Sequence, residues 1–243
     1  MTKQLLIYER AVPLSSEVHR NLSVDVGADY SFAQGINSTP VVAVEFPSAA
    51  AEYTIVFTAN EKDALPILVL GVRDAENLYF KDGQWKAKYI PAFIRRYPFV
   101  FASGDEGKNF TLCIDEGFSG LNREGKGQRL FDDQGQHSPY LENALNFLKD
   151  YQGQYLRTQA FCRKLKELDL LEPMRAQVKG PEGQEINLGG FAAVSRDKLK
   201  KLSGDQLAEL ARTDELELIY LHLASLRNFP GLVGRLAEAA ATA

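Results

Sequence analysis

The segment from Ser138 to about Leu168 constrains the fold most, because its apolar residues recur at helical spacing along its whole length. Ser138 followed by Pro139 is typical of an N-cap and a first helical residue. The apolar positions that follow are Leu141, Leu145, Leu148, Tyr151, Tyr155, Cys162, Leu165 and Leu168. This pattern predicts one long amphipathic helix, with Gly153 as a candidate break point. A helix with one apolar face must cover another layer, so we expect a sheet as its partner.

Strand patterns are concentrated before this helix. Residues 54–58 are rich in β-branched and aromatic side chains, and the run PILVLGV at residues 66–72 is short and continuously apolar. The second pattern is typical of a strand that is buried on both faces in the centre of a sheet. Residues 99–102 and 110–115 are two further predicted strands. Residues 116–137 are rich in Gly, Asp, Asn and Gln, which predicts a long loop or irregular connection.

The stretch from Asn77 to Phe101 contains the only tryptophan of the chain and a dense run of other aromatic residues. Asp82-Gly83 lies between two aromatic segments and predicts a tight hairpin turn, because such a pair readily adopts positive φ angles. Pro91 then opens a predicted helix of one or two turns that ends at Pro98, since proline is tolerated in a first helical turn.

Two interpretations of this aromatic stretch are open. Aromatic side chains commonly bury about 150 to 250 Å² each, so the rings are expected to form core, with Lys86, Lys88 and Arg96 at its solvated rim. In the second interpretation, Trp85, Arg95 and Arg96 frame a groove for an anionic or peptide ligand. Adjacent arginines can bind carboxylates bidentately while an aromatic face stacks on the ligand. Trp85, Arg95 and Arg96 are therefore the candidate ligand-binding residues.

After the long helix, the sequence predicts a second hairpin and several helices. The hairpin is expected to turn at Gly180 to Gly183. Ser203 and Gln206 have the spacing of a capping box at the start of a helix. The alanine-rich tail at residues 232–243 is expected to be a last helix.

These elements predict a single compact α+β domain over residues 1–243. A mixed or mostly antiparallel sheet is expected from about residues 1–135, and helices of the remaining part, about residues 136–243, are expected to cover one of its faces. The hydrophobic fraction of 45% and charged fraction of 25% are ordinary for a globular chain of this length, which can bury a substantial core.

Charge and targeting signals narrow the partners and the compartment. The net charge of −4 argues against binding to nucleic acid, which usually depends on clustered Lys and Arg. The apolar run Leu5–Tyr8 is shorter than a secretory signal needs, and no run reaches the length of a transmembrane segment. We therefore expect a soluble, cytoplasmic protein. Cys113 and Cys162 stand among apolar neighbours and are expected to be buried reduced thiols, with a disulfide between them as the alternative.

No motif for catalysis, metal binding or a cofactor is evident. The run GFSGL lacks the final glycine of a nucleophile elbow, and GKG is not part of a dinucleotide-binding or P-loop motif. Histidine and cysteine spacings do not fit a zinc site. His222 is expected to be a buried histidine with satisfied hydrogen bonds. His137 with Asp132 and Asp133 is interpreted as a turn and helix cap, with a carboxylate–imidazole cluster as the alternative. The sequence thus predicts no catalytic residue, no metal site and no cofactor.

Several segments together resemble the SapC family of bacterial proteins. They occur in the order found in the family, from about Pro13 to Leu226, and read EFPSAAAEYTIVF, LPILVLGV, ENLYFKDGQWKAKYIPAFIRRYPF, FTLCIDEG, LFDDQG, LGGFAAVSRDKLKKLS and LELIYLHLASL. The family is named for a gene beside surface-layer protein genes. Members also occur beside genes for flavin-dependent tryptophan-halogenase-like enzymes, cupin-like oxygenases and TonB-dependent receptors. The resemblance transfers no catalytic residue to this chain.

Three functions are open at this point. The first is a non-catalytic accessory or binding protein that engages a peptide or protein partner, which is favoured because no catalytic group of residues is evident. The second is an enzyme or enzyme subunit that modifies a peptide, a surface polymer or an imported metabolite, as the gene neighbourhoods of the family imply. The third is a surface-layer-associated structural protein, which rests on the family name.

Overall fold

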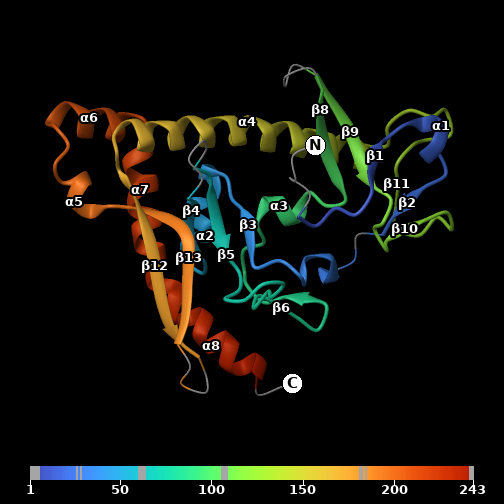
Figure 1. The fold of residues 1–243 in the computed structure, drawn as a ribbon. Coiled ribbons are helices and arrows are strands. Elements are labelled where there is room, and N and C mark those ends of the chain that lie inside the picture. Colours follow the sequence, from blue (N-terminus) through green and yellow to red (C-terminus); the bar gives the residue numbers. More distant parts are fainter. Residues whose placement is uncertain are drawn as a thin grey trace.

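The computed structural model describes residues 6–25, 27, 29–59, 64–104, 109–180, 183 and 185–240. Its longest element is the predicted helix, α4 (Pro139–Glu167), which crosses the upper part of the molecule (Figure 1). The Ser138 side chain accepts a hydrogen bond of 3.2 Å from the Leu141 N–H, as an N-cap should. The helix runs through Gly153 without a break. Buried side chains on both sides of Gly153, among them Tyr151 and Thr158, hold it in the packed layer.

The main sheet has five strands in the order β12-β13-β4-β5-β3, and all of its pairings are antiparallel. The strands are β3 (Ser38–Pro40), β4 (Thr54–Thr58), β5 (Pro66–Val69), β12 (Leu171–Lys179) and β13 (Glu185–Val194). The predicted strand at residues 54–58 and the predicted buried strand after Pro66 are therefore confirmed.

The sheet was expected to lie within about the first 135 residues, but it also includes strands from the later part of the chain. The predicted second hairpin is β12 and β13, and the Gly183 N–H donates to the Gly180 carbonyl at 2.9 Å in its turn. Phe191 and Ala192 of β13 pair with Thr58 and Phe57 of β4, so the hairpin adds two strands to the sheet. Local periodicity does not reveal this long-range pairing.

A second antiparallel sheet has the order β1-β9-β8 and contains the strands predicted before the long helix. Its strands are β1 (Ala11–Pro13), β8 (Phe99–Gly104) and β9 (Asn109–Asp115). The predicted turn at Asp82-Gly83 joins β6 (Phe80–Lys81) to β7 (Gln84–Trp85). Both turn residues have positive φ angles, 53° and 74°, so this prediction is confirmed.

The predicted loop at residues 116–137 contains two short strands. These are β10 (Leu121–Asn122) and β11 (Gln128–Arg129), and both pair with β2 (Ser23–Val24). Gly127 allows the chain to pass close to β2, because a Cβ at this position would lie only 2.3 Å from the Val24 carbonyl oxygen. The turn-rich composition concealed these strands, which have only two residues each.

Short helices connect the strands that precede α4, and further helices follow β13 as predicted. The short helices are α1 (Ser16–His19), η1 (Ser31–Ala33), η2 (Ala43–Glu45), α2 (Phe46–Ala49) and α3 (Ala92–Arg95). The later ones are α5 (Arg196–Leu199), α6 (Gly204–Arg212), α7 (Glu215–Ser225), η4 (Leu226–Asn228) and α8 (Phe229–Ala240). Ser203 and Gln206 form the predicted capping box of α6, and the last helix begins earlier than expected, at Phe229.

Helix α7 is attached to the main sheet by two buried polar side chains. His222 is fully buried; its Nδ1–H donates to the Ile55 carbonyl at 2.9 Å, and its Nε2 accepts from the Val194 N–H at 3.0 Å. The Ser225 hydroxyl accepts from the Ile55 N–H at 3.0 Å and donates to the His222 carbonyl. Burial lowers the pKa of His222 to about 4, so the ring is neutral at physiological pH. His222 is the buried histidine with satisfied hydrogen bonds that the sequence predicts.

Candidate functional site

Trp85 belongs to the hydrophobic core. Its side chain is only 8% exposed, and its Nε1–H donates to the Tyr53 hydroxyl at 2.7 Å. The Tyr30 ring contacts it edge-on, with the ring centroids 6.1 Å apart. Most neighbouring rings in the stretch, such as Tyr79 and Phe93, are also buried. The expectation that most of these rings form core is therefore confirmed. Lys86 and Lys88 are exposed at the rim as expected, whereas Arg96 is half-buried among rings instead of lying at the solvated rim.

Arg95 and Arg96 lie against aromatic rings, and each arginine has its own set. The half-buried Arg96 guanidinium lies 4.3 Å from the Phe93 ring centroid and 4.9 Å from that of Tyr151. Arg95 is exposed, and its guanidinium lies 5.2 Å from the Phe147 ring centroid. These cation–π contacts join α3 to α4. No contact between described residues joins Trp85 to either arginine, and ligand binding by the three residues stays a prediction.

The buried carboxylates bind backbone amides. Asp115 is fully buried and accepts hydrogen bonds of 2.8 to 3.0 Å from the N–H groups of Glu9, Arg10 and Gly117. Glu45, which is 4% exposed, accepts from the Ala92 N–H and the Tyr89 hydroxyl, both at 2.7 Å, and from a further backbone amide. These acids stabilise loops and helix starts, and their oxygens are already occupied by donors.

The acidic residues near His137 form a turn, as the preferred interpretation expects. Asp132 Oδ1 accepts hydrogen bonds from the N–H groups of Gln134 and Gln136, at 2.9 and 2.8 Å. The imidazole of His137 instead lies 2.8 Å from Glu142 on α4. Among the described residues, no three His, Cys, Asp or Glu side chains are grouped so that they could hold a metal ion.

Both cysteines are free and buried, as expected for reduced thiols. Cys162 lies on α4, where burial raises the pKa of its thiol to about 12. Cys113 lies on β9, and burial raises the pKa of its thiol as well. A thiol with a raised pKa is a weak nucleophile at neutral pH, so these groups act as core side chains.

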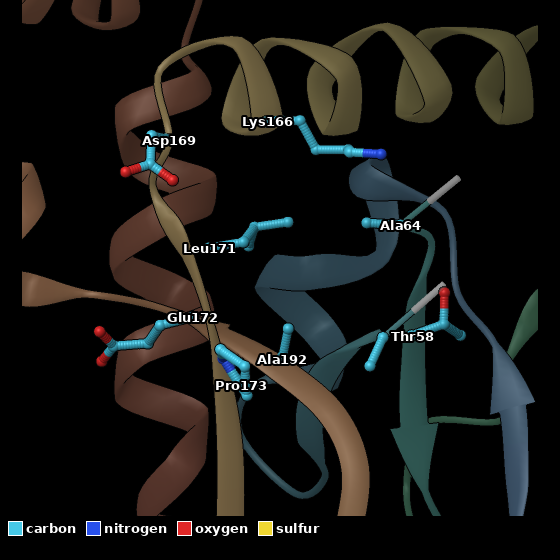
Figure 2. Close-up of a pocket in the computed structure, with 9 residues that line it drawn as sticks. Thr58, Ala64, Lys166, Asp169, Leu171, Glu172, Pro173 and Ala192 are labelled. Carbon is cyan, nitrogen blue, oxygen red and sulfur yellow. The ribbon is translucent and has the colours of Figure 1, made fainter. Parts of the chain in front are cut away.

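A cavity of about 270 Å³ lies between the end of α4 and the strands β4, β12 and β13. Small and apolar side chains, including Leu171, form much of its lining. Figure 2 shows that Asp169 and Glu172 lie to one side, whereas Lys166 extends toward Ala64. The charged groups do not converge on one point, as a site for a small polar substrate would require.

Two further cavities lie at the surface. One, of about 300 Å³, is polar and is lined by Ser15, Gln136, His137 and Glu142 among others. The other, of about 590 Å³, lies between β12 and the helices α5 and α7. None of the cavities described here is lined by the predicted residues Trp85, Arg95 and Arg96.

Three of the four edge strands in the two larger sheets carry a proline at an outward-facing position. In antiparallel pairing, alternate residues direct their N–H and C=O groups away from the neighbouring strand. The Leu14 N–H donates inward to the Leu112 carbonyl, so Pro13 of β1 faces outward. The same alternation makes Pro40 of β3 and Pro173 of β12 face outward. Proline has no N–H, so these edges cannot fully pair with another strand.

Strand β8 is the fourth edge strand, and its sequence FVFASG contains no proline. The Pro98 carbonyl accepts inward from the Asp115 N–H, so Phe99, Phe101 and Ser103 direct their backbone groups outward. Phe99 is engaged by other residues. The outward groups of Phe101 and Ser103 form no hydrogen bond among the described residues.

A groove of about 350 Å³ lies between α4 and the hairpin β8–β9, and Phe101 of the free edge forms part of its lining. It is lined by Phe101, Phe110 and Leu112 from the hairpin β8–β9 and by Leu145, Lys149 and Gln152 from α4. Phe110 is 41% exposed, which is unusual for so large an apolar side chain. In Figure 1 the strands β8 and β9 cross α4.

The residues of this site were not predicted from the sequence. FVFASG was predicted only as a strand, because an edge position depends on the order of strands in the sheet. The sequence carried no signal for this edge, because the interior strands β4, β9 and β13 lack proline just as β8 does.

Comparisons with known proteins identify the family. No curated protein matches the chain, and no solved structure matches it. Among the described residues, no helix combines the length and the apolar character needed to cross a membrane. The family model for SapC matches residues 14–232, which is most of the chain and includes every strand of the two larger sheets except β1. The chain therefore belongs to the SapC family.

Proposed function

We propose that this protein is a non-catalytic binding protein that holds an extended segment of a peptide or protein partner at the edge of β8. The observation that carries the proposal is the pair of free outward-facing residues, Phe101 and Ser103, beside an apolar groove. An extended segment can add to such an edge as a new strand. Its main chain then supplies hydrogen bonds, and its side chains enter the groove.

The prolines on the other three edge strands also support a binding site at β8. Proteins normally protect sheet edges, because an unpaired edge pairs with other chains. Pro13, Pro40 and Pro173 protect β1, β3 and β12. A chain that protects three edges and leaves the fourth open beside an exposed phenylalanine has the features of a strand acceptor at that edge.

The polar groups support a binding role over catalysis. The most deeply buried acid, Asp115, is saturated by backbone amides, and His222 uses both ring nitrogens to attach a helix to the sheet. A general acid or base must reach its substrate, which these groups do not. The rival proposal of an enzyme acting on a peptide, surface polymer or metabolite needs a reactive group elsewhere in the chain.

Ser103→Pro tests the proposal, because it gives β8 the same protection that the other edges have. The substitution removes an outward N–H and leaves the pairing of β8 with β9 intact, and Ser103→Ala is the matched control. A library of random heptapeptides displayed on phage is selected on the wild-type protein. Selected peptides are then synthesised, and their binding to all three proteins is measured by fluorescence anisotropy.

We expect selected peptides to bind the wild type and Ser103→Ala equally and to bind Ser103→Pro about tenfold more weakly. One lost hydrogen bond of about 1.4 kcal/mol corresponds to that factor. Circular dichroism melting confirms that both variants are folded. The proposal fails if no peptide is enriched, or if a folded Ser103→Pro protein binds the peptides as tightly as the wild type does.

A further inference from the structure

The free edge of β8 is short and is closed at one end. The Phe99 N–H donates to the Arg96 carbonyl at 2.8 Å, and the Phe99 carbonyl accepts from the Tyr8 hydroxyl at 2.7 Å. Tyr8 is itself buried, so it is a fixed part of the fold. Only Phe101 and Ser103 remain for pairing. At about 3.4 Å per residue, a partner strand of roughly three residues fills this space.

The groove beside the edge selects for apolar side chains. Phe101, Phe110 and Leu112 form one wall, and the Phe101 and Phe110 ring centroids are 5.6 Å apart. Leu145 on α4 extends the apolar lining. A strand paired with β8 places every second side chain on the groove side. Those side chains contact apolar atoms and are expected to be apolar themselves.

Lys149 is the one charged residue among the described residues that line the groove. It is exposed, and no ion pair between described residues involves it. The adjacent acid on the helix, Asp150, points in another direction, because neighbouring residues on a helix do not share a face. Among the residues that the structure describes, Lys149 therefore gives the groove a positive charge with no acidic partner.

We propose that the groove binds a short apolar strand that carries a carboxylate facing Lys149. The carboxylate is that of an acidic side chain. The closed end at Phe99 packs on Tyr140, nine residues before Lys149 on α4, so a partner chain that ended there would not place its terminal carboxylate at Lys149. This inference rests on the proposed function and adds the chemistry of the partner.

Three fluorescein-labelled heptapeptides with alternating valine and threonine test this chemistry. The first contains an aspartate and has an amidated terminus, the second lacks the aspartate and has a free carboxyl terminus, and the third is neutral and amidated. Binding is measured by anisotropy at low and high salt. Proteins compared are the wild type, Lys149→Gln, Lys149→Glu, Ser103→Pro and Lys201→Gln, which removes an exposed charge far from the groove.

We expect the aspartate peptide to bind the wild type about three- to fivefold more tightly than the neutral peptide, as an exposed ion pair allows. High salt should reduce this preference. Lys149→Gln should abolish it and Lys149→Glu should reverse it, whereas Lys201→Gln should leave it unchanged. A carboxylate preference shown only by the peptide with the free carboxyl terminus would overturn the assignment of the group to a side chain.

The results separate the two proposals. If all three peptides bind the wild type equally and Ser103→Pro weakens all of them, the carboxylate inference is wrong and strand addition at β8 stands. If Ser103→Pro binds every peptide as the wild type does, strand addition itself is wrong. A wild-type protein that is dimeric by light scattering, with monomeric Ser103→Pro, identifies a second copy as the occupant and also overturns the inference.

Discussion

His222 should make the stability of the fold depend on pH in a specific way. The ring is fully buried between α7 and the sheet, and its two nitrogens bind the Ile55 carbonyl and the Val194 amide. Protonation would place a second N–H where Nε2 now accepts a hydrogen bond, and it would bury a charge. Desolvation accordingly lowers the pKa of His222 from its ordinary 6.5 to about 4.

The sign and size of the effect follow from proton linkage. Between pH 6.5 and 4 the unfolded chain binds a proton at this position and the folded chain does not, so the free energy of unfolding falls as pH falls. The contribution is fully present above pH 6.5. At about 1.36 kcal/mol per pKa unit, the complete loss is about 3 kcal/mol, and about 2 kcal/mol of it is lost between pH 7.5 and 5.

Urea unfolding of the wild type and His222→Gln at pH 7.5 and 5 measures this loss. At pH 7.5 the variant should be less stable by about 1 to 3 kcal/mol, because glutamine leaves one buried partner unsatisfied. Between the two pH values the wild type should lose about 2 kcal/mol more than the variant, since other titrating groups cancel in the comparison. His137→Gln, which removes an exposed imidazole, is the control for the loss of one histidine.

Equal losses for the wild type and His222→Gln would refute the reasoning, because they would mean that His222 does not resist protonation in the folded state. If the variant is too unstable for urea unfolding, the proton NMR signal of the His222 ring gives the same information. That signal should not titrate in the folded protein above about pH 5. Titration near pH 6.5 would contradict the buried, neutral ring.

Two other groups of substitutions test the described contacts. Asp115→Ala should destabilise the protein by about 3 kcal/mol, because several buried backbone amides lose their acceptor. Asp115→Asn should destabilise it less, because one side-chain oxygen remains. Urea unfolding measures both losses. Arg96→Lys should lower the free energy of unfolding by about 1 kcal/mol, because a compact ammonium stacks poorly among several rings. The exposed Arg95→Lys should cost less, and an equal loss from both would show that the rings around Arg96 add nothing.

Local features of the fold were predictable from the sequence. The turn at Asp82-Gly83 and the cap at Ser138 depend on a few adjacent residues, and both are as predicted. The predicted helix break near Gly153 is wrong, because the tertiary packing of α4 outweighs the cost of one glycine in a helix, about 1 kcal/mol.

Features that depend on distant residues were not predictable. Arg96 lies between Phe93, three positions away, and two distant residues, Tyr8 near the start of the chain and Tyr151 on α4. The addition of β12 and β13 to the main sheet depends on pairing with β4, which no local pattern records. The site at β8 was missed for the same reason, because only the order of strands in the sheet shows which strand lies at an edge.

The prolines at three strand borders also limit the size of any assembly that this chain can form. A subunit with two open sheet edges can pair with another subunit at each edge, and such subunits can assemble into fibres of unlimited length. Here Pro13, Pro40 and Pro173 close three borders. If β8 accepts a strand as proposed, the prolines on the other edges of the two larger sheets oppose a second addition there, which would favour complexes of fixed stoichiometry.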